Sequence, residues 1–158
     1  YPGFTSAIWQ CHPQSRGSIE IINPDPTADP KIQPNYLADE LDQKTMIEGI
    51  KILRKIYKQP KFQDLWDAEI IPGEQVKTDA EIIDAIRKGG GTVYHPVGTC
   101  KMGIDAAAVV GPDLLVHGVT GLRVVDASIM PLITSANTNA PTLMIAEKAA
   151  EMILASGN

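Results

Sequence analysis

The sequence predicts an α+β fold, in which helices and short antiparallel strands share one chain of 158 residues. Two observations lead to this prediction. Apolar residues recur every three or four positions in three segments, which is typical of helices with one buried face. Short apolar or alternating runs stand between turns rich in glycine and proline, which indicates strands. With 44% apolar and 21% charged residues, the chain has the composition of a globular domain.

Residues 5–34 are predicted to form two short strands followed by an irregular connection. Two short strands are expected within residues 5–22, at the apolar run 7–9 and at the alternating run 18–21, on either side of a turn at 13–17. The segment 23–34 holds four prolines, which remove backbone donors, so an irregular surface connection is expected there.

Two helices are predicted in the middle of the chain. The first covers about residues 39–58, with Asp39 as its N-cap and an apolar stripe at three- and four-residue spacing. The second covers about 79–88, opens with a capping box at 78–81 and ends at the glycines 89–91. These glycines follow a helix instead of opening one, which argues against a phosphate-binding loop.

From residue 92 onward the sequence predicts strands that lead into two polar turns. A strand-like run at 92–94 precedes His95, and strands at 114–116 and 122–125 are joined by a glycine-rich hairpin. Val124 and Val125 are apolar without alternation, as in a strand covered on both faces. The final, mostly buried helix is expected to start near Pro141, a residue that suits the first turn of a helix.

Several classes of function are disfavoured by composition. The net charge of −5 without a Lys/Arg cluster argues against nucleic acid as a ligand. The sequence contains no run of about 18 apolar residues, so no membrane span is predicted, and residues 1–4 do not resemble a signal peptide. The chain lacks an initiating Met, so we expect a piece of a longer protein. Cys11 and Cys100 make no disulfide framework and are expected to be reduced, partly buried thiols.

His95 is the first candidate functional residue. It lies between a strand and the rigid turn 96–99, and histidine is the side chain that accepts protons near neutral pH. Considered alone, it fits a structural role better than a catalytic one. A metal-dependent hydrolase would need a ligand set drawn from widely spaced residues that match no tetrahedral pattern, namely His12, His95, His117 and Cys100.

A second group of candidates surrounds the start of the final helix. Asp126 and Ala127 end an apolar strand, the kind of place where α/β sheets bind ligands. Asn137 and Asn139 follow about ten residues later, although an Asn before a helix is often only a cap. The free backbone N–H groups near Ala140 and Thr142 carry the positive end of the helix dipole, which suits the negative edge of a reduced flavin.

Three motifs follow one another along the last part of the chain. They are Tyr-His-Pro at 94–96 with Gly-Thr-Cys-Lys-Met-Gly at 98–103, Gly-Leu-Arg-Val-Val-Asp-Ala-Ser-Ile-Met-Pro at 121–131, and Asn-Thr-Asn-Ala-Pro-Thr at 137–142. In this order they resemble the C-terminal signature of the glucose–methanol–choline (GMC) family of FAD-dependent oxidoreductases, closest to its choline-dehydrogenase-like and alcohol-dehydrogenase-like branch. Shorter matches lie at 15–17 and 35–37, so the resemblance covers nearly the whole chain.

The resemblance implies oxidation of a primary alcohol to an aldehyde. His95 matches the histidine that takes the hydroxyl proton while hydride passes to flavin N5, and Asn137 matches the second active-site position, which orients the substrate oxygen. The family's cofactor-binding segments match the remaining candidates, which are Asp126, Ala127, Asn139, Ala140 and Thr142. No metal is implied.

The resemblance also implies a division of the chain and a set of partners. Residues 1–103 match part of a substrate-binding domain with an antiparallel sheet and helices, and residues 104–158 match the return to the FAD-binding domain with its last strand and helix. The glycine-rich dinucleotide fingerprint is missing. We therefore expect the isolated piece to be inactive, not to hold FAD tightly, and to need the N-terminal FAD-binding part of the same protein.

Further partners follow from the same resemblance. They are a small-molecule alcohol and an electron acceptor, either dioxygen or a quinone. The alternative function is a non-catalytic structural or binding module. Alone, the piece is expected to pack unusually or to pair with a copy of itself, which would cover exposed strand edges. The expected location is cytoplasmic, with peripheral attachment to a membrane as the alternative.

Overall fold

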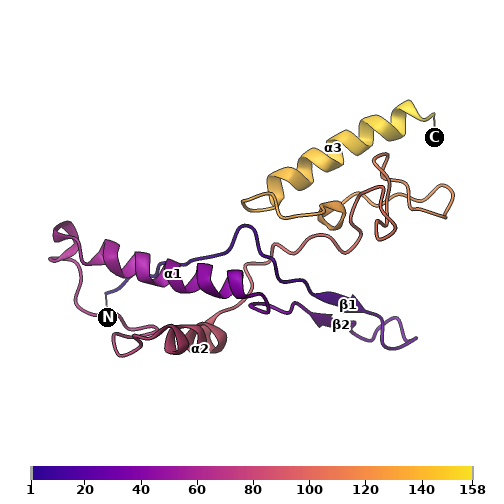
Figure 1. Cartoon of the computed structure of the whole chain (residues 1–158). Coiled ribbons are helices and arrows are strands. Elements are labelled where there is room, and N and C mark those ends of the chain that lie inside the picture. The colour runs from indigo at the N-terminus through magenta and orange to yellow at the C-terminus, as the bar shows by residue number, and fades with distance from the viewer. Residues whose placement is uncertain (1, 158) are drawn as a thin grey trace. The chain divides into compact units, whose positions relative to one another are not determined.

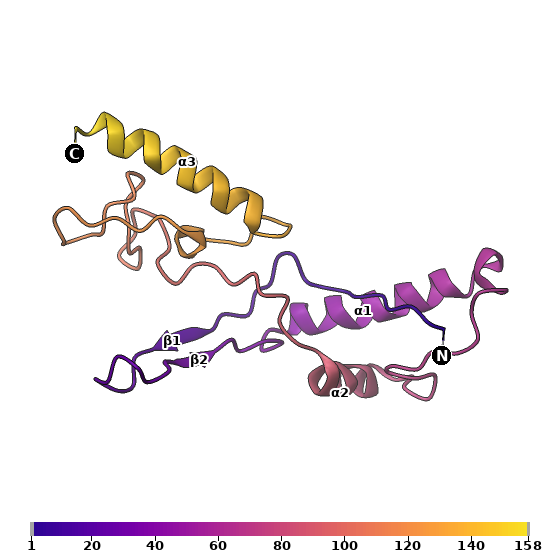
Figure 2. The same cartoon turned by 180° about the vertical axis from the view of Figure 1, so that it is seen from behind.

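The computed structural model describes residues 2–157, which divide into two compact units (Figures 1 and 2). The first unit contains residues 2–17 and 33–93, and the second contains 18–32 and 94–157. The elements are, in order, β1 (Ser18–Glu20), β2 (Lys31–Gln33), α1 (Glu40–Tyr57), η1 (Pro60–Phe62), α2 (Asp79–Gly89), η2 (Ala127–Ile129) and α3 (Asn139–Ala155). Three α-helices with a two-stranded antiparallel sheet confirm the predicted α+β class.

The two helices of the first unit begin where local capping signals predict. The Asp39 carboxylate accepts a hydrogen bond from the Leu41 N–H at 2.8 Å and starts α1. Thr78 and Glu81 form the predicted capping box at the start of α2. The two helices pack against each other, and Ile47 of α1 and Ile82 of α2 are buried.

The N-terminal segment is fastened to α1 by a buried carboxylate. Asp42 is only 3% exposed, and its oxygens accept hydrogen bonds from the backbone N–H groups of Gln14 and Ser15, from the Ser15 hydroxyl and from the Gln10 amide. The predicted strand at 7–9 is absent, because this stretch runs along α1, where the Ile8 side chain lies against Gly49.

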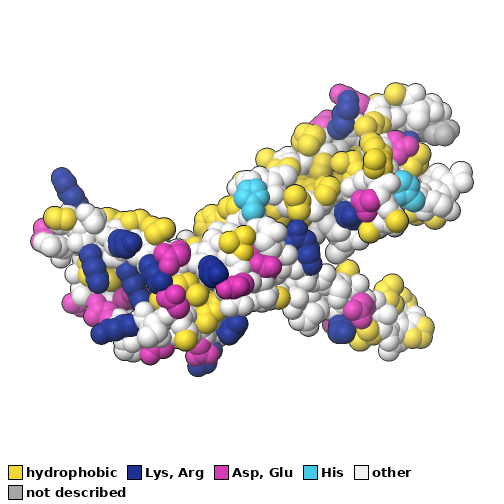
Figure 3. All heavy atoms as spheres, in the orientation of Figure 1, with side chains coloured by type: hydrophobic (Ala, Val, Ile, Leu, Met, Phe, Trp, Pro, Cys, Tyr) yellow, Lys and Arg dark blue, Asp and Glu magenta, His cyan; other side chains and the backbone are white. Residues whose placement is uncertain are grey.

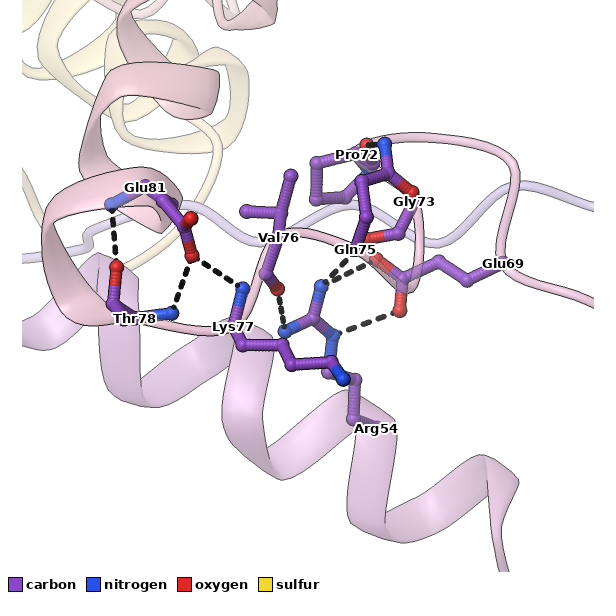
Figure 4. A network of polar contacts seen from close by, with 9 residues as sticks. All are labelled: Arg54, Glu69, Pro72, Gly73, Gln75, Val76, Lys77, Thr78 and Glu81. Carbon is purple, nitrogen blue, oxygen red and sulfur yellow. Dashed lines mark hydrogen bonds and ion pairs between the residues drawn. The ribbon is translucent and has the colours of Figure 1, made fainter.

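The loop between the helices of the first unit is anchored by Arg54 (Figure 4). Its guanidinium donates to both carboxylate oxygens of Glu69 at 2.8 Å and to the carbonyl oxygens of Gly73 and Val76 at 3.3 and 2.7 Å. Such a fork-shaped contact is specific to arginine. The loop is thus held against α1 by one side chain.

The second unit has its own hydrophobic core. The buried residues come from the loop after His95, from η2 and from α3, and they are Val110, Leu114, Ile129, Met130, Ile145 and Ala149. η2 contacts α3. The strands predicted at 114–116 and 122–125 are present only as isolated bridges, Val110 with Val116 and Leu115 with Arg123, and 92–94 forms no strand.

The proline-rich segment is the clearest correction. Residues 31–33, predicted as part of an irregular connection, form β2 and pair with β1. Pro30 and Pro34 flank the strand without interrupting it, a position that proline tolerates. β1 is shorter than the predicted run 18–21 because Ile21 lies outside it.

Apolar side chains reach the surface over the β1–β2 hairpin and over α3 (Figure 3). In the hairpin they are Ile19, Ile21, Ile22 and Ile32, and on α3 they are Leu143, Met144 and Leu154. Within the described residues, none of the helices combines the length and apolar character that a membrane span requires. Cys11 and Cys100 are free and half-buried, as predicted.

Candidate active site

The backbone turns sharply directly before His95. Tyr94 has φ of 60°, in the left-handed region that residues with a side chain rarely adopt. Gly98 follows with φ of 89°, and a Cβ at this position would lie 3.3 Å from the carbonyl oxygen of Met130. Left-handed residues of this kind are often retained at functional sites. The turn predicted around His95 is therefore built from two constrained positions.

The segment after His95 is tied to η2. The N–H of Cys100 donates to the carbonyl oxygen of Ser128 at 3.0 Å, and the N–H of Met102 donates to that of Ile129 at 2.7 Å. These bonds join two of the three motifs noted in the sequence. The packing of η2 against α3 adds the third motif to the same unit.

His95 contacts the residue that precedes α3. Its half-buried imidazole places Nδ1 3.0 Å from Oγ1 of Thr138, and the backbone N–H of Thr138 points to the same nitrogen at 3.4 Å. The other ring nitrogen, Nε2, has no hydrogen-bond partner within residues 2–157. His95 thus lies at the amino end of α3 with one nitrogen held and the other unengaged.

Asn137, the second predicted catalytic residue, is exposed and immediately precedes Thr138. Ser135, two residues earlier, is again in the left-handed region with φ of 63°. The structure therefore places Asn137 beside the residue that contacts His95. A surface hollow of the second unit, lined by residues 111–113 and 115–121, includes neither of them.

The start of α3 has no capping group. Thr138 is its N-cap residue, but its side chain caps no N–H group, and the first turn holds no acidic residue. Asn139 and Ala140 are exposed there. A helix start with free N–H groups and no competing carboxylate attracts negative charge. This donor set fits the anionic edge of a flavin.

Two other predicted cofactor-binding residues have local partners in the structure. Asp126 is exposed and caps η2 by accepting hydrogen bonds from the N–H and hydroxyl of Ser128. The Thr142 hydroxyl donates to the carbonyl oxygen of Thr138 at 2.6 Å. Ala127 packs against the core of the unit. The backbone N–H of Thr142 is engaged as well, with the carbonyl oxygen of Thr138 at 3.0 Å. The second carboxylate oxygen of Asp126 is the group that suits a ligand.

Thr138 is the site residue that the sequence analysis did not single out. Threonine before a helix is a common cap, and that ordinary expectation hides any other role. Nothing in the sequence indicates that Thr138 contacts His95 instead of capping the helix. Among residues 2–157, no three His, Cys, Asp or Glu side chains come close enough together to hold a metal ion.

Comparison with known proteins identifies the relatives of this chain. The profile of the family described as GMC oxidoreductase, C-terminal, matches residues 13–146. An alcohol dehydrogenase [acceptor] of Pseudomonas putida is 53% identical over 96% of this chain, which corresponds to 28% of that protein. An oxygen-dependent choline dehydrogenase of Paraburkholderia xenovorans (strain LB400) is 44% identical over 96% of this chain and 27% of that protein.

A solved structure supports the same relationship. The FAD-dependent oxidoreductase from Chaetomium thermophilum superimposes with a TM-score of 0.87 at 29% identity, covering 93% of this chain and 26% of that protein. The name of this neighbour states FAD dependence, which agrees with the FAD cofactor predicted for the complete protein. The chain spans little more than a quarter of the length of each of these three proteins.

Proposed function

Because the chain belongs to the GMC oxidoreductase family, we propose that it is the C-terminal part of an FAD-dependent oxidoreductase that converts a primary alcohol to an aldehyde. One observation supports this best. Thr138, which directly follows Asn137 in the chain, holds the imidazole of His95 at the uncapped start of α3, and Nε2 has no hydrogen bond within residues 2–157. The names of the two relatives, an alcohol and a choline dehydrogenase, agree with an alcohol substrate.

The bound FAD supplies the acceptor for the hydride that leaves the alcohol carbon. Nε2 of His95 accepts the hydroxyl proton, so that the electron pair left on oxygen forms the carbonyl. Asn137 donates a hydrogen bond to the same oxygen and orients it. The proton therefore ends on the imidazole, and the chain provides the base and the positioning group.

The remaining candidates would hold the cofactor. The backbone N–H groups of the exposed residues Asn139 and Ala140 would bind the negative edge of the flavin, assisted by the helix dipole. Asp126 and Ala127, at the start of η2, and Thr142, in the first turn of α3, would line the rest of the same binding surface. No acidic residue in the first turn opposes this arrangement.

The partners of the chain are part of the proposal. The N-terminal FAD-binding part of the same protein completes the site and covers the apolar surface of α3 and the hairpin. In this scheme residues 1–103 belong to the substrate-binding domain and 104–158 to the FAD-binding domain. A small alcohol is the substrate, dioxygen or a quinone is the electron acceptor, and the location is cytoplasmic, with peripheral attachment to a membrane as the alternative.

His95→Ala in the complete protein tests the proposal. We expect the rate of flavin reduction by substrate, measured anaerobically by stopped-flow absorbance, to fall by about 10²- to 10⁴-fold, the usual contribution of a general base. Asn137→Ala should lose less, mainly in the same step. His117→Ala is the matched control, since His117 lies exposed in another loop.

An unchanged reduction rate in the His95 variant would leave the alternative reading, in which His95 only ties two turns together and the chain is a structural module. Separately, steady-state assays of the wild-type protein with dioxygen and with an artificial quinone acceptor distinguish oxidase from dehydrogenase activity.

A further inference from the structure

We propose that Thr138 is a positioning residue for His95, and that its hydroxyl is the acceptor that lets the imidazole carry its proton on Nδ1. The inference rests on the proposed function, in which Nε2 of His95 receives the substrate proton. It concerns a residue that contacts neither substrate nor cofactor in that scheme. Its action on the reaction passes through the His95 ring.

The geometry brings two groups of Thr138 to one ring nitrogen. Oγ1 of Thr138 lies 3.0 Å from Nδ1 of His95, and the backbone N–H of Thr138 points to the same atom at 3.4 Å. Thr138 is 7% exposed, so water does not readily replace either contact. The two residues lie 43 positions apart, so the contact is tertiary.

Thr138 makes this contact instead of a cap. A threonine at the N-cap usually accepts a hydrogen bond from the second or third N–H of the helix. Here the Thr138 side chain accepts none. Its carbonyl oxygen accepts from the N–H and the hydroxyl of Thr142, at 3.0 and 2.6 Å, which fixes the backbone of Thr138 from the helix side. The hydroxyl is therefore free to serve His95 from a rigid position.

The two contacts differ in the forms of the neutral ring that they allow. A neutral imidazole carries one N–H and one lone pair. The backbone N–H of Thr138 can only donate, so it favours a lone pair on Nδ1 and places the proton on Nε2. The hydroxyl can also accept, so it allows a proton on Nδ1 and leaves the lone pair on Nε2. Only this second form can take a proton from substrate at Nε2.

The hydroxyl is the closer of the two groups and can donate to Nδ1 in the first form or accept from it in the second, whereas the N–H supports only the first form. The second form therefore depends on the hydroxyl as its acceptor. When Nε2 takes the substrate proton, the resulting cation still donates from Nδ1 to the same oxygen. The ring therefore keeps its orientation through the proton transfer.

Thr138→Val and Thr138→Ser in the complete protein form the test. Valine keeps the shape and removes the hydroxyl, which leaves only the donating N–H at Nδ1, whereas serine keeps the hydroxyl. We expect valine to slow flavin reduction by about 10- to 10³-fold, less than the roughly 10⁴-fold known for a wrong histidine tautomer in serine proteases. Serine should stay within about 5-fold of the wild type, since the hydroxyl acceptor remains.

A readout independent of turnover is the ¹⁵N spectrum of the histidine-labelled protein, with the His95 signals assigned by their loss in His95→Gln. In the neutral wild type we expect the proton on Nδ1, and in Thr138→Val on Nε2. If valine does not fold, Thr138→Ala replaces it, and the wild-type spectrum alone still tests the assignment.

Two outcomes overturn the proposal. One is a wild-type spectrum with the proton on Nε2. The other is a valine variant that folds and reduces flavin as fast as the serine variant. The His95→Ala variant distinguishes failure of the proposed function from failure of this inference. If its rate of flavin reduction is unchanged, His95 is not the base, whatever the ¹⁵N spectrum shows.

Discussion

Asp42 is the buried charge on which the first unit depends. Burial raises the pKa of its carboxyl, but hydrogen bonds from the Ser15 hydroxyl and from the N–H groups of Gln14 and Ser15 outweigh that effect, so the pKa lies below its ordinary value. A carboxylate with several N–H donors favours its charged form. The ordering of residues 10–15 along α1 is therefore linked to the ionisation of one side chain.

Asp42→Asn should destabilise the protein. The amide keeps one oxygen acceptor and turns an NH₂ group towards N–H donors, so at least one buried donor loses its partner, at a cost of about 1 to 3 kcal/mol. Urea denaturation at pH 7, followed by circular dichroism, measures this. Asp39→Asn is the control, since asparagine is an equally good N-cap there.

The dependence of stability on acidic pH should also differ between the wild type and Asp42→Asn. Because the folded pKa of Asp42 is lowered, its contribution is fully present above the unfolded value of about 3.9 and is lost as pH falls through the folded value. The stability gap between wild type and Asp42→Asn should narrow below about pH 4. A gap that stays constant from pH 7 to pH 3 would contradict the assigned linkage.

At the scale of elements, Arg54 shows how a loop without regular structure is held to a helix. The Arg54 hydrogen bonds lower the pKa of Glu69, and both side chains are mostly buried. Figure 4 shows the guanidinium of Arg54 reaching from α1 to Glu69 and to the carbonyl oxygen of Val76, beside the capping box of α2. One side chain thus sets where the loop ends and where α2 begins.

Arg54→Lys tests this anchoring. A lysine keeps the charge but cannot donate in a fork to Glu69 and also reach two carbonyl oxygens, so we expect a loss of about 1 to 3 kcal/mol in the free energy of unfolding. Arg87→Lys, the same exchange at an exposed position of α2, should change stability by less than about 0.5 kcal/mol. Limited proteolysis should cut the loop 69–77 faster only in the Arg54 variant.

At the scale of the whole molecule, the exposed apolar side chains and the greater length of the relatives both indicate that further parts of the protein contact this chain. Isoleucines of the β1–β2 hairpin and leucines of α3 lie at the surface, where soluble proteins rarely leave large contiguous apolar areas. The chain spans 28% of its alcohol dehydrogenase relative. We infer that the rest of the protein covers these surfaces.

The 158-residue chain produced alone should therefore purify without stoichiometric FAD and should not oxidise alcohols. Its candidate cofactor contacts come from two short segments, at η2 and at the start of α3, and these offer little buried surface for a large ligand. Absorbance near the flavin bands after gel filtration measures binding. A yellow 1:1 complex formed by the chain alone would refute this expectation.

Helices were predictable because their signals are local. The Asp39 cap and the Thr78–Glu81 capping box lie next to the turns they stabilise, so both helices start at the expected residues. Strands were not predictable in the same way, because strand pairing depends on residues that are distant in the sequence. The run 122–125 has the composition of a strand but pairs only through the bridge at Arg123, whereas β2 forms between two prolines because β1 lies beside it.

For the site, the sequence by itself determined the family, the candidate base His95 and its companion Asn137, since motif order and spacing are properties of the chain alone. Only the tertiary structure decided that Thr138 turns to His95 and leaves α3 uncapped. The hydroxyl of a threonine at a helix start can bond either to an N–H group of the helix or to a side chain from elsewhere in the fold. The choice depends on where the fold brings a histidine that lies 43 residues away.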